Sequence, residues 1–199
     1  MISKIGASQE IGKANAMSAA LPVAVPLQVR HLVIVLGDQL DAESSALQNF
    51  DATQDVVWMA EVAEESTHVW SAKQRTAVFL SAMRHFAHDV RTRGLPLCYT
   101  ALDDDNNPGT LAGVLQQDIA ALQPAGLVLT APGDWRVLHS LRAVAAAHQL
   151  PLDLRDDTHF FSTVREFAAH AKGRKQLRLE YWYRALRQQH GDNAHTTAL

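Results

Sequence analysis

The chain has 199 residues, of which 47% are hydrophobic and 20% are charged, and its formal net charge is −3. This length suits one domain with a sizeable core, and the composition excludes a chain that is disordered throughout. The negative charge excludes a globally basic nucleic-acid-binding protein, so any contact with phosphates must be local.

The N-terminal residues 1–29 show no helical or strand periodicity, and we expect them to form a flexible extension. Pro22 and Pro26 interrupt their apolar stretch, so it does not match the apolar core of a signal peptide. After this extension, continuous apolar runs at 32–36 and 56–59 predict strands that are buried on both faces, as in a parallel sheet. The residues between these two runs predict a short helical or irregular connection.

From Val69 to Val90 apolar residues recur at helical spacing, which predicts a long helix that Gly94 ends. Further on, Thr110 is a suitable N-cap for a helix that Pro124 terminates. The same reading gives three more strands and one more helix, namely strands at 97–102, 126–130 and 152–154 and a helix that starts at 132–134. Two further helical patterns cover 163–172 and 175–190, with Gly173 as the break between them.

Strands that alternate with helices imply a parallel sheet with crossover connections. We therefore predict a doubly wound α/β domain over residues 30–157, with a mostly parallel, five-stranded, Rossmann-like sheet. A short helical connector is expected over 158–190, and a disordered tail over 191–199.

Polar residues follow the first two predicted strands, where doubly wound folds place their ligands. Gly37 and Asp38 come directly after the first strand, and they either make and cap a tight turn or receive a polar ligand. Glu61, Glu64 and Glu65 follow the second strand. These carboxylates could bind a cation or orient a polar heterocycle, but solvation of the next helix start is the favoured interpretation from the residues alone.

The segment from Pro132 to Arg136 follows the fourth predicted strand and contains Asp134 and Trp135. The simplest interpretation is structural: Pro132 begins a turn, Asp134 complements the helix dipole and Trp135 packs on the sheet. Because the segment lies at the carboxyl edge of the sheet, Asp134 and Trp135 are also candidates for contacts with a ligand.

Basic and aromatic residues gather near the C-terminus, a mixture that can neutralise phosphates and stack bases. They are Arg174, Lys175, Arg178, Arg184 and Arg187, interleaved with Tyr181, Trp182 and Tyr183. A solvated amphipathic helix would have the same pattern. Arg174, Lys175, Arg178 and Trp182 are therefore candidates for docking another domain, as the first choice, and for contacting DNA as the second.

Other reactive residues give no motif. The ten histidines lack the spacing of a metal site, and Ser81 and Ser140 lie in predicted helices without a nucleophile elbow. We predict neither a metal site nor catalytic residues.

The single Cys98 cannot form an internal disulfide, and one cysteine cannot hold an iron–sulfur cluster, which takes about four thiolates. We expect a cytoplasmic protein without a membrane span, since no apolar run reaches the roughly 18–20 residues required.

Five motifs resemble the photolyase-related proteins of bacteria, the iron–sulfur branch of the photolyase/cryptochrome family that includes (6-4) photolyases. They are Leu36-Gly37-Asp38-Gln39-Leu40, residues 59–65, residues 81–86, residues 132–136 and the Gly173-Arg174-Lys175-Gln176-Leu177 run. The resemblance covers residues 30–190 and implies the N-terminal α/β domain and the start of the connector. It further implies that flavin adenine dinucleotide and the iron–sulfur cluster belong to a helical domain expected beyond residue 199.

The resemblance also implies an antenna chromophore, 6,7-dimethyl-8-ribityllumazine or a similar heterocycle, at the turn of Gly37 and Asp38. Glu65 matches the acid that holds the lumazine in relatives, and Glu61 matches the acid at the strand end. His68 stands where relatives often have a tyrosine, and Phe79 where they have a smaller aliphatic residue. A ring at Phe79 would take space that the heterocycle needs, so a pocket of ligand size is expected only if Phe79 turns toward the core.

These features predict the light-harvesting part of a DNA photolyase or cryptochrome, a lyase family by resemblance, which is not catalytic on its own. Contact with DNA would then depend on the flavin-binding domain. Two alternatives stay open. One is a free-standing module that binds a nucleotide, pterin or lumazine, and the other is an inactive truncated remnant.

Overall fold

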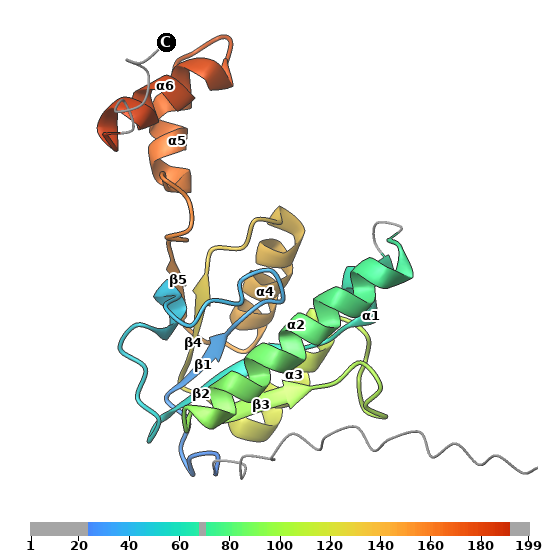
Figure 1. Ribbon diagram of the computed structural model, residues 1–199. Coiled ribbons are helices and arrows are strands. Elements are labelled where there is room, and N and C mark those ends of the chain that lie inside the picture. Colours follow the sequence, from blue (N-terminus) through green and yellow to red (C-terminus); the bar gives the residue numbers. More distant parts are fainter. Residues whose placement is uncertain (1–23, 68–70, 192–199) are drawn as a thin grey trace, which may run out of the picture.

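The computed structural model describes residues 24–67 and 71–191 (Figure 1). Residues 1–23 of the expected extension, His68, and residues 192–199 of the expected tail lie outside this part of the chain. Val29 is buried, and the guanidinium of Arg30 donates to both carboxylate oxygens of Asp55 at 2.9 and 2.5 Å. These two contacts join the residues just before β1 to the α/β unit.

The centre of the protein is a five-stranded, all-parallel sheet, which confirms the predicted fold class. Its strands lie in the order β3-β2-β1-β4-β5. They are β1 (His31–Ile34), β2 (Asp55–Ala60), β3 (Leu97–Thr100), β4 (Gly126–Thr130) and β5 (Leu152–Arg155). The central β1 pairs with both β2 and β4, so Leu32 lies between Val56 and Leu127. All residues of β2 and β4 are buried, as their uninterrupted apolar runs predict.

Helices cover both faces of the sheet, which makes the fold doubly wound (Figure 1). On one face, α2 (Lys73–Thr92) packs Met83, Ala87 and Val90 against β2, β3 and Val35, the residue after β1. A short 3-10 turn, η1 (Ser45–Leu47), covers β1 and β4 on the same face. On the other face lie α3 (Leu111–Leu122) and α4 (Trp135–Ala147), which contact each other.

The helix boundaries follow local signals in the sequence. The Thr110 hydroxyl accepts from the backbone N–H of Gly113 and caps α3, as predicted, and α3 ends before Pro124. A five-residue helix, α1 (Ala63–Thr67), carries Glu64 and Glu65 in its first turn. That placement agrees with the interpretation that these acids solvate a helix start. No helix in the described ranges is long and apolar enough to cross a membrane.

Beyond β5 the chain forms a hairpin of α5 (Val164–Ala171) and α6 (Leu179–Gln189), which stands apart from the α/β unit (Figure 1). The helix predicted to start at residue 175 starts four residues later, at Leu179, because residues 175–178 form turns and extended backbone. Neither helix contains a fully buried residue. The helical connector is therefore present, and it makes little contact with the sheet.

Candidate functional site

The strand order places a topological switch point between β1 and β4. The chain runs outward from β1 through β2 to β3 and then crosses to β4 on the other side of β1. The segments that leave the carboxyl ends of these two strands consequently diverge and leave a crevice, which is where open α/β sheets bind ligands. Gly37 and Asp38 form one lip, and the segment from Pro132 to Asp134 forms the other.

The side chain of Gln39 holds the two lips together. Its amide Nε2 donates to the backbone oxygens of Thr130, the last residue of β4, and of Ala131, the next residue, at 3.4 and 3.0 Å. Gln39 is 7% exposed, and its Oε1 has no hydrogen-bond partner within the described part of the protein. The separation of the lips is thus fixed by a buried side chain as well as by the sheet.

Between the lips lies a narrow inner cavity of about 40 Å³. Its polar lining comes from Asp38, Glu61, Glu65, Ser66 and Asp134, and its apolar lining includes Leu36, Phe79, Met83, Leu111 and Val137. Small-molecule pockets usually measure about 300–1,000 Å³, whereas one water needs roughly 10–15 Å³. The inner cavity therefore has room for a few waters and not for a heterocycle.

Phe79 is the residue that narrows this cavity. A Cβ atom built on Gly37 would lie 2.4 Å from Cζ of Phe79 and 2.8 Å from Sδ of Met83. Only glycine fits at position 37 while the ring stays in place, because real side chains do not approach so closely. The ring of Phe79 thus turns toward the first strand and fills the space beside Gly37.

A second, wider cavity of about 320 Å³ lies outside the ring of Phe79. Asp38, Glu65, Ser66 and Phe79 line both cavities. The outer cavity is also lined by Ser71, which precedes α2, by Arg75 and Thr76 at the start of α2, and by Arg136 of α4. It lies within the usual size range of small-molecule sites.

Glu65 stands at the rim shared by the two cavities. Its pKa is raised, first because packed atoms reduce the hydration of the carboxylate and then because Asp38, Glu64 and Asp134 are negative, while Arg136 opposes the shift. Asp38 and Asp134 come from opposite lips, so the site brings three of the predicted acids together. Their oxygens form an acceptor surface suited to N–H and O–H groups of a ligand.

Glu61 lines the inner cavity, but its carboxylate is already engaged by the protein. Arg84 donates to both oxygens at 2.7 and 2.8 Å, the hydroxyl of Tyr99 donates to Oε1, and the N–H of Leu102 donates to Oε2 at 2.9 Å. Burial by itself would raise the pKa of Glu61, yet these hydrogen bonds outweigh it and the pKa is lowered. Glu61 therefore joins β2, α2 and β3 at the base of the site.

Asp134 has the structural role that the sequence favours. Its carboxylate accepts from the N–H of Arg136 at 2.8 Å, which caps α4, and it also pairs with the Arg136 guanidinium. The expectation that Trp135 packs on the sheet is wrong. Trp135 is 67% exposed, and its ring stacks on His139 one turn along the same helix. Because Trp135 lines neither cavity, it lies beside the site and not in it.

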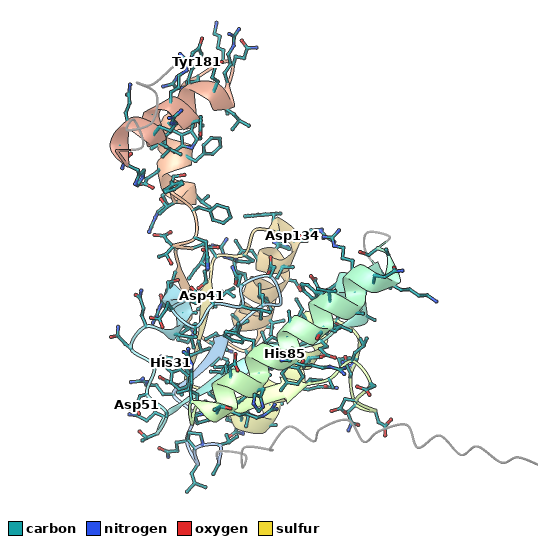
Figure 2. All side chains as sticks on the ribbon, viewed as in Figure 1. His31, Asp41, Asp51, His85, Asp134 and Tyr181 are labelled. Atoms are coloured by element: carbon teal, nitrogen blue, oxygen red, sulfur yellow. The ribbon has the colours of Figure 1, made fainter. Side chains whose placement is uncertain are left out.

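The predicted connector residues lie on the α5–α6 hairpin, which also carries Tyr181 (Figure 2). Trp182 packs inside the hairpin, with its ring 5.9 Å from Phe167 and 4.5 Å from His170. Arg174, Lys175 and Arg178 are exposed, and Arg178 lies over the ring of Tyr181. The hairpin thus has a half-buried aromatic contact on its inside and an exposed basic surface, and none of these residues lines the crevice.

Several residues of the site escape prediction from the sequence. Arg75 and Thr76 belong to the first turn of α2, and Arg84 and Tyr99 hold Glu61. The sequence did contain a signal for partners of Glu61. A carboxylate at the end of a strand that is buried on both faces requires a cation or several hydrogen-bond donors. Nothing in the local pattern indicates which residues supply them.

The all-parallel sheet with helices on both faces makes this part of the chain a doubly wound α/β unit, and its polar crevice lies at the switch point. Residues 33–191 match the family model of deoxyribodipyrimidine photo-lyase-related proteins, and the chain belongs to this family. It is similar to a (6-4) photolyase of Agrobacterium fabrum, strain C58, with 39% identity over 160 residues. That match covers 80% of this chain and 32% of the relative, so the chain spans about a third of the relative's length.

Proposed function

We propose that this chain is a chromophore-binding antenna module of the photolyase-related family. It binds a small heterocycle with a polyhydroxyl chain, of the 6,7-dimethyl-8-ribityllumazine type, in the crevice between β1 and β4. The observation that carries the proposal is the meeting of Asp38, Glu65 and Asp134 beside a 320 Å³ cavity at the topological switch point. The family assignment supports the same site, because it extends over every residue that forms it.

The chemistry of the crevice suits such a ligand. A ribityl chain and a ring imide supply hydroxyl and N–H donors, and the carboxylates of Asp38 and Glu65 accept from them. The outer face of Phe79 offers an aromatic surface for a planar ring. With the inner cavity occupied by the Phe79 side chain, the ring of the ligand lies in the outer cavity.

We expect saturable one-to-one binding when the purified chain is titrated with 6,7-dimethyl-8-ribityllumazine and followed by fluorescence anisotropy. Glu65→Gln should weaken binding about tenfold, since a hydrogen bond to a charged group contributes about 1.5–3 kcal/mol. Glu64→Gln is the matched control, because Glu64 is the neighbouring acid on α1 and lines neither cavity. Equal affinities for the two variants, or no saturable binding by the unaltered chain, would contradict the proposal.

Light-driven repair of DNA, the activity that the relative's name implies, is proposed here only for the antenna module acting together with a flavin-binding domain. The exposed Arg174, Lys175 and Arg178 on the hairpin supply the docking surface for that domain. Two features support this part of the proposal: the hairpin stands apart from the sheet, and it exposes Tyr181 and Tyr183, which are 52% and 59% accessible.

A further inference from the structure

The outer cavity carries a set of hydrogen-bond donors that have no side-chain partner among the described residues. Ser66, Ser71 and Thr76 line it, and their hydroxyls make no side-chain hydrogen bond within the described residues. Arg75 also lines it, and its guanidinium forms no ion pair within those residues. These four groups come from α1, from Ser71 before α2 and from the first turn of α2, and they meet at one cavity.

A second cation, which comes from α4, also lines the outer cavity. Arg136, in the first turn of α4, lines the outer cavity and is paired with Asp134. A guanidinium has five N–H donors, so one ion pair leaves Arg136 able to donate to a further anion. The start of the 20-residue helix α2 lies at the same place, and its N-cap, Ala72, supplies no capping side chain.

Donors and acceptors therefore occupy the same cavity. Asp38 and Glu65 would repel an isolated anion, but they suit the hydroxyls of a sugar or sugar alcohol. Dinucleotide-binding folds combine these functions, since a carboxylate receives the ribose hydroxyls while N–H donors receive the phosphate. A ligand that carries both groups satisfies the two halves of this cavity together.

We propose that the outer cavity binds the phosphate of a phosphorylated chain, so that the ligand class is a heterocyclic sugar or sugar-alcohol monophosphate. Arg75, Thr76 and Arg136 hold the phosphate, Asp38 and Glu65 receive the hydroxyls, and the ring lies on Phe79. This inference rests on the proposed function and narrows it, because a neutral ribityllumazine leaves the cationic half of the cavity without a partner.

The test compares 6,7-dimethyl-8-ribityllumazine with its 5′-phosphate ester, two probes that differ only in the phosphate. We expect the ester to bind about tenfold more tightly at low salt, as charge-assisted hydrogen bonds from Arg75 would provide. Added salt should reduce this preference. Arg75→Gln and Thr76→Val should each bring the ratio of the two affinities toward one.

Arg93→Gln is the control, since Arg93 is an exposed arginine at the opposite end of α2 and lines neither cavity of the crevice. This variant should keep the full preference for the ester. Equal binding of the two probes, or a preference that survives Arg75→Gln, overturns the phosphate site and leaves the proposed function standing. Failure of both probes to bind overturns both proposals.

Discussion

Glu61→Ala should lower the free energy of unfolding by about 2–4 kcal/mol, because it leaves buried or half-buried donors without an acceptor. Glu61 is 1% exposed and receives hydrogen bonds from Arg84, Tyr99 and Leu102. Arg84 is half exposed and can turn to water, which keeps the loss below that of a fully buried ion pair. Denaturant unfolding followed by circular dichroism measures this change.

The matched control is Glu64→Ala, a substitution of an exposed acid, which should change stability by no more than about 0.5 kcal/mol.

The pH dependence of stability tests independently whether the ionised Glu61 carboxylate stabilises the fold. Because the pKa of Glu61 is lowered by folding from its usual 4.5, its contribution is complete above that value and is lost as the pH falls through the folded-state pKa. The stability of Glu61→Ala should therefore fall less on acidification than that of the unaltered chain. Two outcomes would contradict this role of Glu61 in joining β2, α2 and β3. One is that the stability of both proteins falls equally with pH, and the other is that Glu61→Ala lowers the free energy of unfolding by less than about 1 kcal/mol.

Phe79→Ala should increase the affinity for ribityllumazine by about ten- to hundredfold, because burying an aromatic ring contributes roughly 1.5–3 kcal/mol. Removal of the phenyl group joins the 40 Å³ inner cavity to the 320 Å³ outer cavity and lets the ring lie beside Gly37. The same anisotropy titration measures the gain.

Phe86→Ala controls for the loss of a ring from α2, since Phe86 packs against the same face of the sheet but does not line the crevice. Both variants lose packing, and the unfolding midpoint of each must lie well above the temperature of the titration. Only Phe79→Ala should bind the lumazine more tightly. An unchanged or lower affinity for that variant would mean that the ligand does not approach Gly37.

The sheet could be predicted from the sequence because its signals are local. Uninterrupted apolar runs such as 56–59 occur where strands are buried on both faces, and Thr110 marks the start of α3 with a cap. The parallel direction of the strands follows from the alternation of strands and helices, but their order does not. The lips of the crevice were predictable for the same reason, since each follows directly from the end of a strand.

The contacts across the site could not be predicted in the same way. Arg84 reaches Glu61 across 23 positions of sequence, and Phe79 meets Gly37 only because α2 crosses the end of β1. Trp135 shows the converse: a large aromatic residue predicts burial on average, yet its place on the outer side of α4 leaves it 67% exposed. Such contacts depend on how the helices lie on the sheet, and no local pattern specifies that.

The account depends most on where the ligand binds, and backbone amide chemical shifts of the unaltered chain test this directly. On addition of 6,7-dimethyl-8-ribityllumazine, the amides of Gly37, Asp38, Glu65, Thr76 and Asp134 should shift together and saturate with one dissociation constant. Amides of the α5–α6 hairpin should stay unchanged. Shifts confined to the hairpin or to the amino ends of the strands, or no shifts at all, would contradict the assignment of the crevice as the chromophore site.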